Sequence, residues 1–242
     1  MLVALAVYAF AFLLAWIYPR VLGMKGPERG VHRYALIVPN SGFIGFPVVE
    51  AVMGSFYLFH AAIFNIPLWL LGFSIGLYLI AKEKGKSVSL SWKLFANPPF
   101  IAILAGFTLF FFSIPVPAPL EQGIRMLGAA TTPLVMIITG ITIAQADLKR
   151  IFGRWHIYAT LFARLIFVPV LVALFCFLAG IRGNLMVLAV LLTAMPAAST
   201  TTVIAAVYDV AVEEASSLVV FSMLLSAATI PLILVFVHHI AG

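Results

Sequence analysis

The chain has 242 residues, of which 64% are hydrophobic and only 9% are charged, and its mean hydropathy is +1.18. These values exclude an ordinary soluble domain and indicate an integral membrane protein. The net charge of +6 does not indicate a nucleic-acid partner, because the basic residues fall almost wholly in short loops between apolar runs. The single cysteine, Cys176, excludes an intrachain disulfide and a cysteine-based metal site. No cofactor and no metal are predicted.

Apolar runs of about twenty residues follow one another along the chain, the length that crosses about 30 Å of hydrocarbon as an α-helix. We therefore expect an all-α, polytopic membrane protein. The eight predicted spans are residues 2–18, 32–53, 56–81, 97–114, 122–145, 155–180, 183–208 and 213–240.

Lysine and arginine are concentrated in the first, third and fifth predicted loops. These residues are Arg20, Lys25, Arg29, Arg33, Lys82, Lys84, Lys86, Lys93, Lys149, Arg150 and Arg154. The other side has only Arg125 and Arg182. The positive-inside rule then places the odd loops in the cytoplasm and both termini outside the plasma membrane. Because no basic residue precedes the first apolar run, we do not expect a cleaved signal peptide.

Two spans contain residues that interrupt a helix. The span 32–53 has Pro39, Gly45 and Pro47, and the span 183–208 has Pro196. Proline removes a backbone donor and clashes with the preceding turn. Backbone left unpaired at membrane depth is tolerated only where it is buried in protein or lines a cavity, and paired interruptions indicate a transporter's binding site.

The arrangement of spans predicts an inverted-topology repeat. Spans one to three and six to eight are each a unit of three helices with a broken middle helix, and the second unit begins five spans after the first, an odd number that inverts its orientation. We divide the chain into a first repeat, residues 1–96, with three spans, and a second repeat, residues 97–242, with five. The first repeat is then two helices short, so we expect either an N-terminally truncated ten-span protein or a reduced form that compensates by oligomerising.

The breaks predict an anion site. Asn40 or Ser41 can cap the half-helix after Pro39, and Ser199 or Thr200 can cap the one after Pro196. Two half-helix N-termini would then meet near the membrane midplane, where unpaired N–H groups and positive dipole ends favour a carboxylate. The alternative is that the prolines are ordinary kinks. The candidate substrate-binding residues are Asn40, Ser41, Gly42, Asn65, Pro196, Ala197, Ser199 and Thr200.

Two further polar residues lie within predicted spans. Asn65 either bonds to another helix or lines the substrate cavity. Arg164 is the only charge clearly inside a span, and it either caps broken backbone and acts in gating or serves as a counter-charge for the anion. No deep carboxylate pair supports a cation antiporter, and no convergent nucleophile, acid and base support an enzyme.

Several motifs resemble the auxin efflux carrier family, which includes plant auxin exporters and bacterial carriers of malonate-like or malate-like acids. These motifs are Pro39-Asn40-Ser41, Gly45-Phe46-Pro47, Ala51 to Gly54, Arg164-Leu165 with Pro169, Gly180 to Gly183, and Met195-Pro196 with Ala205, Ala206 and Tyr208. The resemblance covers essentially the whole chain. The central loop near Lys82 to Lys93 is short, so the chain resembles the bacterial members.

The resemblance implies a ten-span inverted repeat with crossed broken helices, often dimeric, that moves its substrate by an elevator-like step. It also implies that Asn40 holds the substrate carboxylate and that Asn65 lines the same pocket. We therefore expect a secondary active or facilitative carrier of small organic anions such as malonate, malate or auxin-like acids, with the lipid bilayer and a second copy as partners. The alternatives are a truncated, non-transporting fragment or subunit and a cation or proton antiporter of related architecture.

Overall fold

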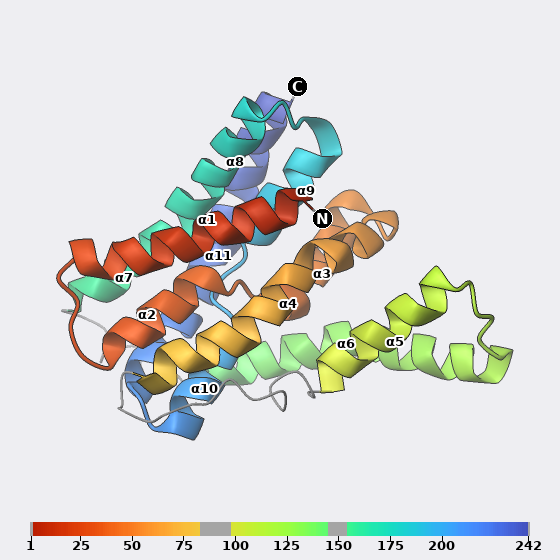
Figure 1. The fold of residues 1–242 in the computed structure, drawn as a ribbon, viewed down its shortest axis with the longest axis horizontal. Coiled ribbons are helices and arrows are strands. Elements are labelled where there is room, and N and C mark those ends of the chain that lie inside the picture. The colour runs from red at the N-terminus through yellow and green to blue at the C-terminus, as the bar shows by residue number, and fades with distance from the viewer. Residues whose placement is uncertain (1, 83–97, 145–153, 242) are drawn as a thin grey trace.

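The structure is a computed structural model that describes residues 2–82, 98–144 and 154–241. These residues form helices without a β-strand, as the sequence predicts (Figure 1). The helices are α1 (Leu2–Val21), α2 (Glu28–Ile37), η1 (Ser41–Gly45), α3 (Phe46–Met53), α4 (Phe56–Lys82), α5 (Pro98–Phe111), α6 (Ala118–Ala144), α7 (Trp155–Phe162), η4 (Ala163–Phe167), α8 (Val168–Leu178), α9 (Gly183–Thr193), α10 (Thr200–Tyr208) and α11 (Val212–Ala241). The predicted repeat boundary at residue 96 and the basic residues Lys84, Lys86, Lys93, Lys149 and Arg150 lie outside the described residues.

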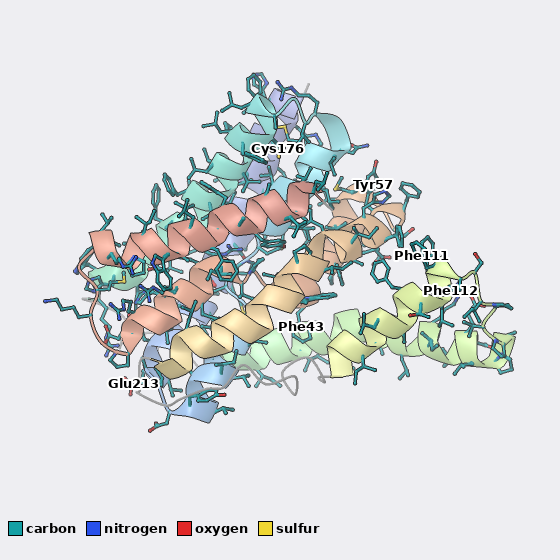
Figure 2. The ribbon with its side chains drawn as sticks, viewed as in Figure 1. Phe43, Tyr57, Phe111, Phe112, Cys176 and Glu213 are labelled. Atoms are coloured by element: carbon teal, nitrogen blue, oxygen red, sulfur yellow. The ribbon has the colours of Figure 1, made fainter. Side chains whose placement is uncertain are left out.

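Three helical stretches of the described chain are long and apolar enough to cross a membrane: Leu2–Val21, Trp155–Leu178 and Val212–Ile240. The broken spans contribute shorter apolar helices, among them Ser41–Met53 and Gly183–Thr193. Large apolar side chains also cover much of the outer surface. Figure 2 shows two of them, Phe111 and Phe112, at the end of α5, where they are 82% and 71% exposed. Such a surface is typical of a protein surrounded by lipid.

Polar contacts identify which helix ends lie together. Glu214, at the start of α11, accepts hydrogen bonds from His32 of α2 and from Arg154, which precedes α7. At the start of α9, the Asn184 amide donates to the Tyr57 hydroxyl of α4 at 2.5 Å. In Figure 1, α5 and α6 extend away from the other helices, which pack around α9.

The centre of the helical body is α9, which is apolar on every side and buried from Met186 to Thr193. Gly45 allows η1 to approach the end of α9 closely. A Cβ atom added at Gly45 would lie 3.3 Å from Leu192 Cδ2 and from Met195 Cγ, closer than an ordinary van der Waals contact. The atom nearest to a Cβ added at Gly42 would be Trp69 Cζ2, at 3.8 Å. Gly45 therefore provides close packing between η1 and the end of α9.

Gly45→Val should lower the melting temperature of the purified protein in detergent, because overpacking a dense interface costs roughly 2 kcal/mol. Gly42→Val is the matched control, since the same side chain there first meets Trp69 at an ordinary distance. Equal melting temperatures for the two variants would contradict the packing argument. Differential scanning fluorimetry measures both.

Candidate functional site

The two broken spans meet at their interruptions. Between α2 and η1, and again between α9 and α10, the chain leaves the helix and runs extended, and the two extended segments are antiparallel. The Asn40 N–H donates to the Pro196 carbonyl at 2.8 Å, and the Ala198 N–H donates to the Val38 carbonyl at 3.1 Å. We call residues 38–41 and 195–199 the crossover. The predicted pair of broken helices is therefore confirmed.

The prolines explain where the helices end. Pro39 and Pro196 have no N–H to continue a helix, and a residue before proline is driven out of the helical region. Val38 accordingly has φ −102° and ψ 101°. The chain does not leave the helix at the other two predicted break residues: Gly45 ends the π-helical turn η1, and Pro47 lies in the first turn of α3. At these positions the helix changes from π to α geometry.

Polar side chains gather beside the paired segments. The Asn40 amide nitrogen donates to Ser199 Oγ at 3.2 Å, which links the two halves of the crossover. The Ser41 hydroxyl donates to Asn65 Oδ1 at 2.6 Å, and the Tyr8 hydroxyl donates to the same oxygen at 3.2 Å. The structure thus brings together Asn40, Ser41, Asn65 and Ser199 from three spans.

One donor in this cluster has no partner. Asn65 is 0% exposed and its Oδ1 is satisfied twice, yet its Nδ2 makes no hydrogen bond. A buried polar group without a partner costs about 1 to 3 kcal/mol, so it marks a place where a ligand oxygen would be stabilised. Asn40 is 2% exposed and Ser41 is 0% exposed, whereas Ser199 on the other half of the crossover is partly exposed.

The predicted capping role of the polar side chains is wrong. Asn40 and Ser199 occupy the positions before η1 and α10, but neither makes a side-chain capping hydrogen bond. Their side chains bond to each other across the crossover instead. Thr200 Oγ1 lies 3.1 Å from the Tyr34 hydroxyl of α2, which also joins the two halves. The first N–H groups of both half-helices therefore have no side-chain cap competing for them.

Arg164 lies in the π-helical turn η4 and is 2% exposed. Its guanidinium donates four hydrogen bonds to three backbone carbonyls. They are Leu36 O at 3.0 Å, Thr193 O at 3.0 Å, and Met195 O at 3.2 Å from Nε and 3.0 Å from Nη2. These carbonyls end α2 and α9, where the helix dipoles are negative. Of the roles that the sequence left open for Arg164, the contacts are those of a cap on broken backbone.

Sequence reasoning missed three residues that support the crossover. Ser222 of α11 accepts the Ala197 N–H at 3.0 Å, while Tyr8 and Tyr34 bond to Asn65 and Thr200. Each is a single hydroxyl in a long apolar run, and no spacing distinguishes it from a packing residue. Only the fold shows which of these hydroxyls face the breaks.

Interrupted helices that pair around buried polar groups are the architecture of membrane transporters. The chain matches the family model described as "Membrane transport protein" over residues 84–234, which is more than half of its length. It therefore belongs to this family, the auxin efflux carrier family that its motifs resemble. The protein is a member of a family of membrane transporters.

Curated relatives are consistent with this assignment. An "Uncharacterized transporter" of Methanothermobacter thermautotrophicus is 27% identical over 90% of this chain and 72% of its own length. An "Uncharacterized transporter" of Methanocaldococcus jannaschii is 26% identical over 92% of this chain and 73% of its own length. A "Putative malonate transporter" of Rhizobium meliloti is 33% identical over 62% of this chain and 47% of its own length.

Proposed function

We propose that the protein is a secondary active or facilitative carrier of small organic anions, and that the carboxylate of its substrate binds at the crossover. The observation that carries the proposal is the unpartnered Nδ2 of Asn65, which is fully buried beside Asn40 and Ser41. A carboxylate oxygen accepts hydrogen bonds only, so it is the complementary partner for a buried amide donor.

The electrostatics of the crossover favour the same ligand. The half-helix N-termini at η1 and α10 have no side-chain cap and carry the positive ends of their dipoles, although at α10 the Thr201 and Thr202 N–H groups already donate to the Ala198 and Ser199 carbonyls. Arg164 offsets the negative ends of α2 and α9 with a full positive charge. Among the described residues, the side chains that contact the crossover include no carboxylate. The "Putative malonate transporter" of Rhizobium meliloti is named for a carboxylate substrate, which also supports this class.

The proposal includes the setting in which transport occurs. The protein would lie in the plasma membrane with both termini outside, as the positive-inside rule predicts. Because Asn40, Ser41 and Asn65 are buried, the substrate would enter and leave in other conformations, by alternating access. An elevator-like step and a homodimer remain part of the proposal.

A ligand screen tests the proposal directly. Malonate, malate, acetate and an aromatic monocarboxylate are added to the purified protein, and its melting temperature is measured. A ligand at about 100 times its dissociation constant stabilises the folded state by about 2.7 kcal/mol, so a true substrate should raise the melting temperature. The shift should disappear in Asn65→Leu and persist in Asn184→Ala, which removes an exposed amide that bonds to Tyr57. No shift with any carboxylate would refute the anion assignment.

A further inference from the structure

A second buried polar network lies away from the crossover, among the starts of three helices. His32 of α2 is 0% exposed. Its Nδ1 is 2.7 Å from Thr160 Oγ1 of α7, and its Nε2 is 3.1 Å from Glu214 Oε1 of α11. Both ring nitrogens are therefore engaged, one with a hydroxyl and one with a carboxylate.

An ion pair connects this imidazole to the surface. Glu214 is 2% exposed, and its Oε2 accepts a hydrogen bond of 2.5 Å from Arg154 Nη1, whose side chain is 44% exposed. The hydrogen bond to Glu214 raises the pKa of Arg154, which lies outside the span, so the guanidinium stays charged. The net charge of the Glu214–Arg154 pair is zero. Proton uptake by His32 would therefore give the network one positive charge.

Other titratable and charged groups surround the network. They are Glu213 at 3.9 Å from Arg154, Glu28 within electrostatic range of Arg154, the His156 ring at 6.4 Å from the His32 ring, Tyr18 against Thr160, and Arg33 stacked over Trp16 at 4.7 Å. Of these, only Tyr18 faces the Thr160 hydroxyl. Its own hydroxyl is buried, and it interacts with Thr160 without a hydrogen bond of ordinary geometry.

The network can hold His32 in either charge state. A neutral ring donates its Nε2–H to Glu214, and its Nδ1 accepts a hydrogen bond from the Thr160 hydroxyl. A protonated ring donates from both nitrogens, and the Thr160 hydroxyl then turns toward the Tyr18 oxygen, which is free to accept. Proton uptake thus requires a hydroxyl rotation and no movement of the backbone.

Helix α2 and the helix formed by α7 and η4 connect the network to the crossover. Leu36 follows His32 by one helical turn on α2, and Arg164 follows Thr160 by four residues on the other helix. These residues are also joined, because Arg164 Nη1 donates to the Leu36 carbonyl at 3.0 Å. His32 therefore lies one helical turn from the residue whose carbonyl binds the guanidinium that holds both helix breaks together.

We propose that His32, with Glu214 and Thr160, is a proton-binding site whose occupancy strengthens anion binding at the crossover. The inference rests on the proposed function for the identity of the second ligand. His32 precedes Asn40 by eight residues, of which the five to Ile37 rise about 7.5 Å in α2 and the three beyond it, where the chain is extended, add up to about 10 Å. Coulomb's law at a separation of about 17 Å with an effective dielectric constant of about 20 gives roughly fivefold tighter anion binding when the imidazole is charged. By linkage, anion binding promotes proton uptake by the same factor.

The first test follows the proton alone. In the purified full chain labelled at histidine, nuclear magnetic resonance across the range of pH in which the protein stays folded should show His32 taking up a proton. His32→Gln identifies the resonance. Thr160→Val removes the hydroxyl that adapts to both states and should shift the titration to lower pH. A His32 resonance that stays constant over this range overturns the proposal, whether or not an anion binds.

The second test measures the coupling with malonate as the probe. From about pH 8 to about pH 5.5, malonate affinity by calorimetry should rise about fivefold more in the original protein than in His32→Gln. His156→Gln, which removes a neighbouring imidazole outside the hydrogen-bonded chain, should behave like the original protein. Protonation of malonate itself changes with pH equally in the measurements on all three proteins, so it cancels when their affinities are compared. Equal pH dependence in His32→Gln overturns the coupling, whereas failure of every protein to bind any carboxylate refutes the proposed function instead.

Discussion

Arg164→Met should destabilise the protein by about 3 kcal/mol and lower its melting temperature more than any surface substitution. Methionine keeps much of the apolar stem but leaves the Leu36, Thr193 and Met195 carbonyls without their donor. Each buried acceptor that loses its partner costs about 1 to 3 kcal/mol, and relief from burying the charge offsets part of the loss. Thermal or denaturant unfolding in detergent measures the effect.

Arg182→Met is the matched control for this substitution. Arg182 is exposed, and it donates to the Phe177 carbonyl at 2.7 Å and stacks over the Phe177 ring at 3.9 Å. Its loss should cost less than about 1 kcal/mol. Arg164→Lys should fall between the two, because an ammonium keeps the charge but cannot reach three carbonyls with a planar fork. Equal stability of the two methionine variants would show that Arg164 does not hold the breaks together.

Asn40→Ala should slow carboxylate transport into liposomes by about ten- to hundredfold. A hydrogen bond to a charged ligand contributes about 1.5 to 3 kcal/mol, and each 1.36 kcal/mol corresponds to a factor of ten. The fold should survive, since the side chain makes one hydrogen bond, to Ser199, and the backbone pairing with Pro196 does not need it. The probe is the carboxylate that gives the largest thermal shift.

A matched pair of variants makes the transport result specific. Asn184→Ala removes another amide from the helical body and should transport normally. Asn40→Asp should fail like Asn40→Ala, because a second negative charge would repel the substrate carboxylate. If Asn40→Ala transports at the original rate, the assignment of this residue to the substrate is wrong, even if other carboxylate data support a carrier.

Apolar run length and proline positions were sufficient to predict most of the fold. The eight predicted spans correspond to helices or interrupted helices of the structure, and the breaks at Pro39 and Pro196 lie where proline chemistry predicts them. These features depend on local sequence, so they can be read from it. The inverted repeat and its boundary at residue 96 remain predictions.

The candidate site was predicted only in part, because its contacts join distant segments. Asn40, Ser41, Asn65 and Ser199 stand out as polar residues near breaks, but their pairing with each other depends on three-dimensional register. The expected role of Asn40 and Ser199 as helix caps was wrong for that reason. The His32 network could not be found at all, since its members are separated by 128 and 182 residues and none lies near a proline.

The pairing of the two breaks also constrains how the chain is assembled. Asn40 and Ser199 are separated by 159 residues, so the first interruption enters the bilayer long before the segment that satisfies its backbone has been synthesised. Exposed peptide groups at that depth are costly in hydrocarbon. The early helices must therefore remain near water, the translocation machinery or one another until α9 arrives, and completing the crossover is a late event in biogenesis.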